Sequence, residues 1–205
     1  MEDKVLLDVQ GLKTYFHTFK GVVKAVDNVS FSLKEGEILG IVGESGSGKS
    51  VTSFSILKLV EDPGVVDADH IMFDGKDLAK ISEKDMSKIR GKDISMVFQD
   101  PMTSLNPIIT IGKQITSVIM KHQDCTENEA RLRALDLMDK VGIPNPEARF
   151  DDYPFQYSGG MRQRIVIAIA LSCQPKILIC DEPTTALDVT IQAQILKLLK
   201  DLQKE

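Results

Sequence analysis

The chain has 205 residues, of which 42% are hydrophobic and 27% charged, a composition typical of one soluble globular domain. Its formal net charge of −5 argues against a nucleic-acid binder held by general electrostatics. The longest nearly uncharged apolar run, residues 165–175, is shorter than the roughly 20 residues that a membrane-spanning helix needs. We therefore expect no nucleic-acid partner and no direct insertion into a membrane.

The cysteines indicate the compartment. Cys125, Cys173 and Cys180 are widely spaced and show no pairing typical of a metal site. Such residues are usually buried thiols in a reducing environment. The N-terminus is acidic and lacks the layout of a signal peptide, so the sequence predicts a cytosolic chain whose membrane role, if it has one, depends on a partner.

The first 40 residues alternate apolar and polar positions, a pattern that predicts strands at 6–9, 22–26 and 29–33, with a turn at 35–36. The next run, EILGIV at residues 37–42, is apolar throughout, as expected of a buried parallel strand. A helical stretch follows from residue 49 to residue 60.

Further strands are predicted at 71–73 and 94–98, and the apolar period changes to 3.6 residues between residues 110 and 141. Thr126 and Glu129 have the spacing of a capping box, and Gly142 ends this helical region. A buried helix after residue 161, a strand at 176–180 and a last helix from residue 189 complete the pattern. Strands alternating with helices predict an α/β core with a parallel sheet.

Residues 43–50, GESGSGKS, fit the phosphate-binding loop G-x-x-x-x-G-K-[ST] between an expected strand and an expected helix. A chance match in a chain of this length is expected about once in a hundred. Backbone N–H groups would surround the phosphates, Lys49 would reach the β- and γ-phosphates, and the Ser50 hydroxyl would bind Mg²⁺. The predicted nucleotide-binding residues are Gly43, Glu44, Ser45, Gly46, Ser47, Gly48, Lys49 and Ser50.

Two acids, Asp181 and Glu182, directly follow the predicted strand at 176–180. They could merely mark the edge of a sheet, but ligands of open α/β sheets lie at the carboxyl ends of strands. We expect Asp181 to hold Mg²⁺ through water and Glu182 to orient the attacking water as a base. Gln99, which follows another apolar strand, is expected to place its amide near the metal and that water.

The segment YSGGMRQR at residues 157–164 opens a helix. Ser158 has the character of an N-cap, whereas Gly159 and Gly160 are costly at a helix start unless something approaches the backbone closely. Because a helix N-terminus binds anions, this segment predicts an anion site.

In this order, GESGSGKS, FQDP, YSGGMRQR and ILICDEPTTALD resemble the motifs of ATP-binding subunits of ABC transporters over essentially the whole chain. FQDPMTSLNP and SGGMRQR resemble the ATPases of oligopeptide and dipeptide importers in particular. The resemblance implies a P-loop NTPase (RecA-like) core with a parallel sheet, an N-terminal antiparallel β subdomain and an inserted α-helical subdomain. The core and β subdomain would comprise residues 1–98 and 162–205, and the helical subdomain residues 99–161.

The resemblance also assigns roles that the residues alone do not. Ser158, Gly159 and Gly160 would cap the γ-phosphate of ATP held by the opposite subunit of a head-to-tail dimer, and Asp188 would cross the same interface. Tyr157 and Met161 replace the leucine and glutamine of the general pattern, as is common in the peptide-importer branch. Phe16, or alternatively Tyr15, would stack on adenine; either could instead belong to the core.

The implied function is an ATPase that uses ATP and Mg²⁺ to drive import across a membrane. Its partners would be a second ATP-binding subunit, identical or paralogous, and transmembrane permease subunits at the cytoplasmic face of the cell membrane. The alternatives are a soluble ABC-type ATPase of DNA repair or translation, and a nucleotide-gated dimerising module that hydrolyses poorly.

The positions of the three histidines bear on whether the sequence contains every residue of the family's site. The family places a histidine on a strand after the helix that begins here near residue 189. His17, His70 and His122 all precede Asp181 and Glu182, so none matches that position. We expect the 205 residues to be a truncated piece of a longer ATPase, able to bind MgATP but slow to hydrolyse it.

Overall fold

The computed structural model describes residues 4–185 and 187–204. The chain divides into two compact units, Met1–Ser87 and Lys88–Glu205, called here the N-terminal and the C-terminal unit. Helix α2 (Glu83–Ile89) runs across the boundary between them.

The N-terminal unit is built on a five-stranded antiparallel sheet with strand order β2-β1-β4-β5, in which β3 also pairs with β1. Its strands are β1 (Val5–Thr18), β2 (Gly21–Lys34), β3 (Gly64–Asp67), β4 (His70–Phe73) and β5 (Lys76–Asp77). The long β1 contributes its first half to β4 and its second half to β3, while β2 follows it along its whole length.

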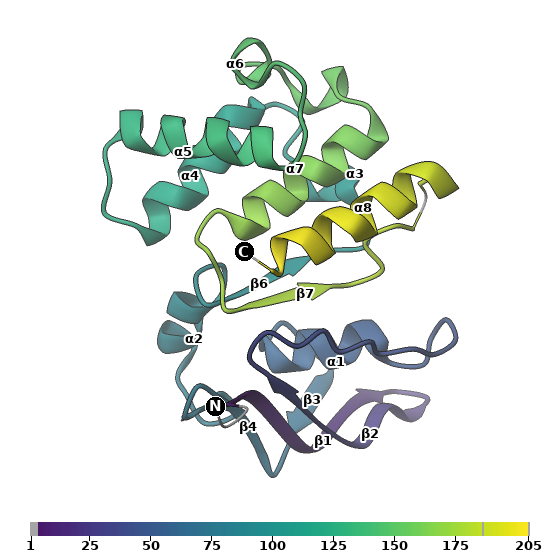
Figure 1. Cartoon of the computed structure of the whole chain (residues 1–205). Helices are drawn as coiled ribbons and strands as arrows, with labels where there is room; N and C mark the ends of the chain where they lie inside the picture. The colour runs from purple at the N-terminus through teal and green to yellow at the C-terminus, as the bar shows by residue number, and fades with distance from the viewer. Residues whose placement is uncertain (1–3, 186, 205) are drawn as a thin grey trace. The chain divides into compact units, whose positions relative to one another are not determined.

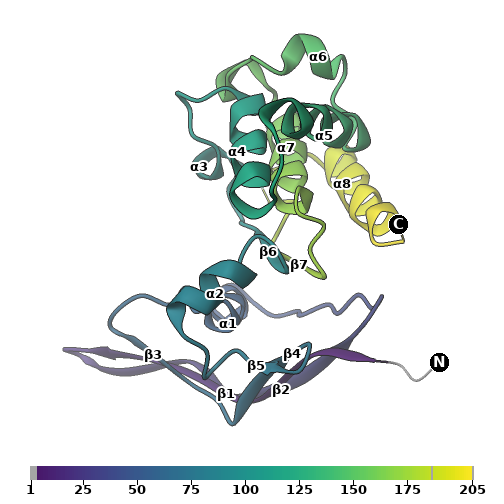
Figure 2. The same ribbon diagram turned by 90° about the vertical axis from the view of Figure 1, so that its left-hand side faces the viewer.

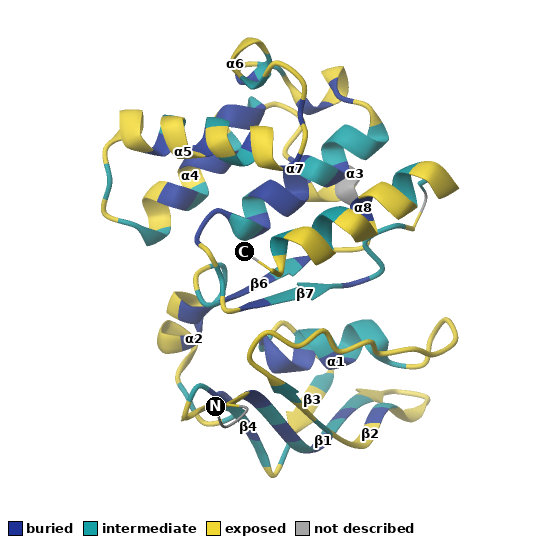
Figure 3. Cartoon of the chain, in the orientation of Figure 1, coloured by how far each residue is buried: buried dark blue, intermediate teal, exposed yellow. Residues whose placement is uncertain are grey.

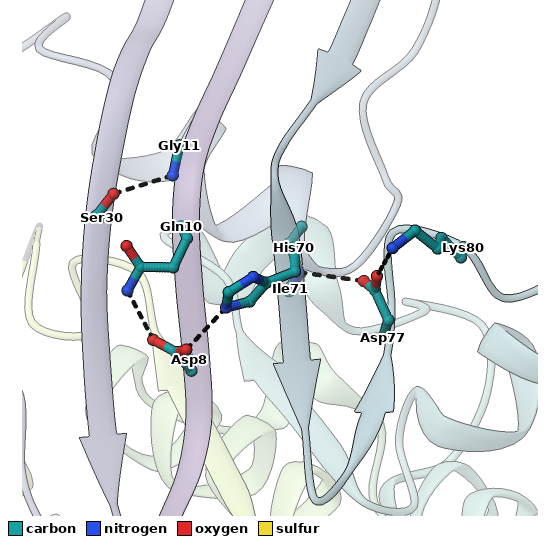
Figure 4. Close-up of polar contacts among 8 residues, drawn as sticks. All are labelled: Asp8, Gln10, Gly11, Ser30, His70, Ile71, Asp77 and Lys80. Atoms are coloured by element: carbon teal, nitrogen blue, oxygen red, sulfur yellow. Dashed lines mark hydrogen bonds and ion pairs between the residues drawn. The ribbon is translucent and has the colours of Figure 1, made fainter.

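The predicted strands at 6–9, 22–26, 29–33 and 71–73 are confirmed, although the second and third belong to one strand, β2. The β1–β2 ladder has register shifts that the alternation pattern does not reveal. One lies beside Gly11, whose φ of +61° lies in the left-handed region and whose N–H donates to Ser30 Oγ at 2.9 Å (Figure 4).

Helix α1 (Lys49–Ile56) packs on this sheet (Figure 1). Thr52, Ser55 and Ile56 form its buried face, and the hydroxyls of Ser55 and Thr14 are hydrogen-bonded at 2.6 Å. The helix is shorter than the predicted 49–60, because Lys58 takes a left-handed φ of +51° that a continuing helix cannot use.

The predicted strand at residues 37–42 is wrong. These residues form no strand, and no strand of the described residues pairs with them. Their exposed fractions are 64% for Ile38, 41% for Leu39, 49% for Ile41 and 96% for Val42. An apolar run is buried as a central strand only where other strands flank it on both sides, and the pattern of a single segment cannot supply those neighbours.

The C-terminal unit contains a parallel pair of strands, β6 (Ile94–Val97) and β7 (Ile177–Cys180), with Ile94 opposite Ile177, as expected of a parallel sheet. Helices α7 (Gly159–Leu171) and α8 (Val189–Leu202) lie on the same side of this pair (Figures 1 and 2). Ile195, in the middle of α8, is fully buried, and the other apolar residues of its inner side are half-buried: Ile191, Leu198, Leu199 and Leu202. The predicted last helix is therefore confirmed.

The remaining helices of this unit are α3 (Pro101–Ser104), α4 (Ile111–His122), α5 (Glu127–Lys140) and α6 (Pro146–Arg149), followed by a 3₁₀ turn at Pro154–Gln156. The buried faces of α4 and α5 meet α7 in one core (Figure 3). The predicted capping box is confirmed, because Thr126 accepts from the Glu129 N–H while the Glu129 carboxylate accepts from the Thr126 N–H. The predicted division at residues 99 and 161 remains a prediction.

Candidate functional site

The loop before α1 has the backbone shape that its glycines permit. Gly46 and Gly48 have φ values of +80° and +92°, in the region that side chains disfavour. A Cβ on Gly48 would lie 2.2 Å from the carbonyl oxygen of Ala25 on β2, a distance that no real contact tolerates. Gly48 is therefore required both by its conformation and by the close approach of the loop to the sheet.

The N-terminus of α1 carries no side-chain cap. Its N-cap is Gly48, and its first turn contains no acidic residue. Lys49 Nζ folds back over the loop and donates to the carbonyl oxygens of Gly43 and Glu44 at 2.9 and 3.0 Å. Backbone N–H groups at a helix start, together with an ammonium group beside them, form a site for an anion such as a phosphate.

The two candidate aromatic residues on β1 have different surroundings. The Tyr15 hydroxyl donates to Asp27, and Lys24 Nζ lies 5.2 Å from the centroid of the Tyr15 ring. The bond from Tyr15 lowers the pKa of Asp27. Phe16 lies on β1 opposite Gly64. A Cβ added to Gly64 would lie 2.8 Å from the Phe16 ring, so the ring can occupy this position only because residue 64 is a glycine.

At the carboxyl end of β7, Asp181 is only 7% exposed, and its backbone N–H donates to the Val97 carbonyl at 2.9 Å. Glu182 follows with a φ of +45°, a left-handed conformation that is uncommon for this residue type. Gln99 Nε2 donates to Glu182 Oε2 at 2.9 Å across 83 residues of sequence. The structure thus joins Gln99 and Glu182 by a direct hydrogen bond, whereas the sequence predicted only that both would lie near the attacking water.

Sequence reasoning missed a second donor to the same oxygen. Thr185 Oγ1 lies 3.1 Å from Glu182 Oε2, and the Thr185 N–H donates to the Glu182 carbonyl at 3.1 Å. The segment of residues 182–185 is therefore a turn closed by both backbone and side chain. The sequence did contain an indication of this bond. Pro183 favours the second position of a four-residue turn, and Thr185, a residue with a hydroxyl group, then occupies the last position of that turn.

The segments around Ser158 and Asp188 lie together in the C-terminal unit. Ser158 Oγ accepts from the Met161 N–H at 3.3 Å, and Asp188 Oδ1 accepts from the Ile191 N–H at 3.0 Å, so each residue caps its own helix. A Cβ on Gly160 would lie 3.0 Å from Ile191 Cγ2, so this glycine lets the starts of α7 and α8 approach each other closely.

Arg164, in the same motif, was also missed as a structural residue. Its Nη1 donates to the Val141 carbonyl at the end of α5, and its Nη2 donates to Gln194 Oε1 on α8, at 2.6 and 3.0 Å. One guanidinium group thus joins the helix of the serine–glycine motif to two neighbouring helices. The sequence could have indicated this role, because an arginine guanidinium group can donate to two acceptors at once.

The cysteines are free thiols. Burial raises the pKa of the Cys180 thiol to about 12 and also raises that of Cys173. Thiols with raised pKa values are poor nucleophiles at neutral pH, so neither is a candidate catalytic group.

Within the described residues, no three or more histidine, cysteine or acidic side chains gather as metal ligands. The phosphate loop and Phe16 belong to the N-terminal unit, whereas Gln99, Asp181, Glu182, the serine–glycine motif and Asp188 belong to the C-terminal unit. Among the helices described, none has the length and apolar character required to cross a bilayer.

The sequence profile of the ABC transporter family matches residues 26–185, which contain the phosphate loop, Gln99, the serine–glycine motif and the acid pair. The chain belongs to the ABC transporter family. The predicted resemblance is thereby confirmed.

Two curated relatives match nearly the whole chain. The oligopeptide transport ATP-binding protein OppD of Bacillus subtilis (strain 168) is 58% identical over 201 residues, which are 98% of this chain and 56% of that protein. The dipeptide transport ATP-binding protein DppD of Escherichia coli (strain K12) is 54% identical over 200 residues, 98% of this chain and 61% of that protein. The chain thus spans less than two thirds of the length of either relative.

Solved structures show the same fold. A dimeric ATP-binding cassette in a post-hydrolysis state, bound to ADP and Pi, superposes with a TM-score of 0.83 at 29% identity and covers 97% of this chain and 83% of that one. A component of an ABC transporter complex from Clostridium perfringens gives a TM-score of 0.79 at 29% identity, over 99% of this chain and 75% of that one. The predicted fold, a P-loop NTPase with an N-terminal antiparallel sheet, is confirmed.

Proposed function

We propose that this chain binds and hydrolyses ATP to drive the import of oligopeptides or dipeptides across the cell membrane. The observation that carries the proposal is the glycine-shaped loop of residues 43–48, which leads into the uncapped start of α1 beside the Lys49 ammonium group. The identities of 58% and 54% to oligopeptide and dipeptide transport proteins support the class of solute.

In this proposal the loop N–H groups and Lys49 hold the phosphates of ATP, and Phe16, with Tyr15 as the alternative, stacks on adenine. The Ser50 hydroxyl, the Gln99 amide and Asp181 through water supply the oxygen atoms that Mg²⁺ prefers. Bound there, Mg²⁺ would neutralise charge on the β- and γ-phosphates.

Glu182 is proposed as the base that orients the attacking water and accepts its proton. Its position supports this role, since it lies just beyond β7 with its carboxylate held by Gln99 and Thr185. Preorganised groups of this kind lower the barrier by positioning and by electrostatics, which are the main contributions a protein makes to phosphoryl transfer.

We further propose that Ser158, Gly159, Gly160 and Asp188 act on nucleotide held by a second ATP-binding subunit, identical or paralogous. The two adjacent helix starts in the C-terminal unit form a surface on which a phosphate could bind. Permease subunits would complete the assembly at the cytoplasmic face of the membrane, and ATP-driven closure of the pair would move them.

The test of hydrolysis is phosphate release from MgATP by the purified assembly. Wild-type protein should release phosphate, whereas Glu182→Gln should bind MgATP with similar affinity and lose at least about a hundredfold in kcat, because an amide keeps the size but not the base. A protein that binds MgATP and closes as a dimer without any phosphate release would instead be a nucleotide-gated module.

The test of the shared site is Ser158→Arg. A large cation at this exposed helix start should prevent ATP-dependent dimers while leaving MgATP binding by one subunit within about twofold. Sedimentation in MgATP measures dimer formation, and Lys20→Arg in the β1–β2 turn is the control. Dimers of Ser158→Arg equal to those of the wild type would contradict the shared site.

The test of the solute class is uptake by cells that lack the gene for this protein. Restoring the gene should restore accumulation of labelled dipeptides or oligopeptides, and a Lys49→Ala gene should not. Unchanged peptide uptake in the absence of the gene would exclude peptides as the solute without affecting the proposal of ATP hydrolysis.

A further inference from the structure

Thr185 lies at the end of the turn that follows Glu182. Its hydroxyl donates to Glu182 Oε2 at 3.1 Å, and its backbone N–H donates to the Glu182 carbonyl at 3.1 Å. The backbone bond closes the turn whatever residue stands at position 185, since every residue except proline has an N–H. The hydroxyl bond, in contrast, depends on the side chain and acts only on the carboxylate.

The Glu182 carboxylate needs a hydrogen bond that fixes its orientation. It is only half-buried and sits in a left-handed conformation with a φ of +45°, so its backbone is constrained while its side chain retains several rotatable bonds. A flexible carboxylate would be oriented toward the attacking water only part of the time. A donor that holds one of its oxygens reduces this freedom before the reaction.

Gln99 donates to the same oxygen, but it differs from Thr185 in how it is held. Gln99 is 83 residues away in sequence and reaches Glu182 with a long side chain from the segment after β6. Its amide oxygen is also proposed above to serve the metal, so the amide has a second task besides the bond from its Nε2 to Glu182. Thr185 is three residues away within one closed turn, and its hydroxyl is not proposed to serve any other group.

We propose that Thr185 is a positioning residue whose hydroxyl, together with the Gln99 amide, holds Glu182 Oε2 in place. The inference rests on the proposed role of Glu182 as the base. It adds a residue that contacts neither nucleotide nor metal and acts only through the orientation of the Glu182 carboxylate.

The test compares Thr185→Val, which keeps the shape and removes the hydroxyl, with Thr185→Ser, which keeps the hydroxyl. Thr185→Val should lower kcat for MgATP hydrolysis about tenfold and change KM less than about twofold. The lost hydrogen bond orients a charged group for the chemical step and does not contribute to the binding of MgATP. Thr185→Ser should retain kcat within about twofold. The variants are made in the protein as its gene encodes it and measured in the purified assembly.

Thr184→Val is the matched control, since Thr184 lies in the same turn and is not among the donors to Glu182. Its kcat should equal that of the wild type. A second control places Thr185→Val in the Glu182→Gln background, where the residual rate should not fall further, because the carboxylate that Thr185 positions is already absent.

The outcomes separate the inference from the proposed function. If Glu182→Gln abolishes hydrolysis but Thr185→Val stays within twofold of wild type, the positioning role is wrong and the base assignment stands. An equal loss in Thr185→Ser and Thr185→Val would also overturn it, since packing rather than the hydroxyl would then matter. If Glu182→Gln hydrolyses normally, the proposed function of Glu182 itself fails.

Discussion

Helix α1 begins at Gly48 with no side-chain cap, whereas α7 and α8 begin at Ser158 and Asp188, each of which caps its own helix. The three helix starts therefore differ in what remains for a ligand. In α1 the N-cap residue, Gly48, has no side chain to accept a hydrogen bond from the first turn. In α7 and α8 one N–H is already satisfied internally, at 3.3 and 3.0 Å.

Under the proposed function, these two kinds of helix start are two ways to present backbone N–H groups to a phosphate. The start of α1 uses glycine and lysine, which give close approach and charge but do little for the stability of the helix. The starts of α7 and α8 are stabilised by their own caps and by each other, through the contact between Gly160 and Ile191. We expect α1 to hold its nucleotide alone and the α7–α8 pair to need a second subunit that brings the nucleotide.

The largest effect should come from Lys49→Ala. Removing the ammonium group beside the start of α1 should lower MgATP affinity at least about a hundredfold, because no other point charge of the loop can replace it. Isothermal titration calorimetry measures the affinity, and Lys20→Ala, in the exposed turn between β1 and β2, is the control. Unchanged affinity in Lys49→Ala would show that α1 is not the nucleotide site.

Gly48→Ala should show that the α1 start is shaped for close approach. A methyl group there would lie 2.2 Å from the Ala25 carbonyl in a backbone with a φ of +92°, so we expect a loss of about 2 kcal/mol in the free energy of unfolding. Gly40→Ala is the matched control, because a Cβ at Gly40 meets nothing within 4 Å. Urea denaturation of both variants measures the difference, and equal midpoints would contradict the crowding argument.

A smaller effect is expected from Asp188→Ala at the start of α8. Loss of the bond to the Ile191 N–H should cost about 1 kcal/mol of stability, and Asp188→Asn should recover most of it, since asparagine caps equally well. Thermal unfolding measures both. If Asp188→Asn keeps the stability but loses hydrolysis in the assembly, the carboxylate acts beyond its own helix, as the shared site requires.

The smallest effect should arise far from any helix start, on the sheet of the N-terminal unit. The hydrogen bonds from His70, at 2.8 Å, and from Gln10 lower the pKa of Asp8 below its ordinary value of 3.8 (Figure 4). The folded state therefore favours the ionised form. The resulting stability is present above about pH 4 and is lost as the pH falls through the lowered pKa.

Asp8→Asn should remove this pH dependence. Acid denaturation followed between pH 5 and pH 2 should show a flatter curve for Asp8→Asn than for the wild type. Asp67→Asn, on the exposed end of β3, is the control, and its curve should match that of the wild type. Identical curves for all three proteins would mean that the bond between Asp8 and His70 has no effect on stability.

Much of the local chemistry, in which a residue interacts within three or four positions of itself, was predictable, although the bond from Thr185 to Glu182 was missed. The Thr126–Glu129 capping box, the Ser158 cap and the glycine-lysine loop were all identified from spacing, because their hydrogen bonds and backbone angles depend on the segment alone. The strands β6 and β7 were likewise predicted from two short apolar runs, although their pairing with each other was not.

Contacts between segments that are distant in the sequence were not predictable in the same way. The run at residues 37–42 was assigned to a buried strand, yet in the structure Val42 is 96% exposed, because apolar character does not say which strand will lie beside it. The register shifts in β1 and the contact between Phe16 and Gly64 were equally invisible, since each depends on a strand elsewhere in the chain.

The amino-acid sequence by itself determined which groups this protein has for chemistry: a loop that can surround a phosphate, two acids after a strand, an amide after another and a serine before two glycines. Those properties follow from residue types and short spacings. Only the tertiary structure decided that Gln99 reaches an oxygen of Glu182, and that Gly160 lies against Ile191. Contacts between distant segments depend on how the helices and strands pack, and packing is a property of the whole core rather than of any one segment.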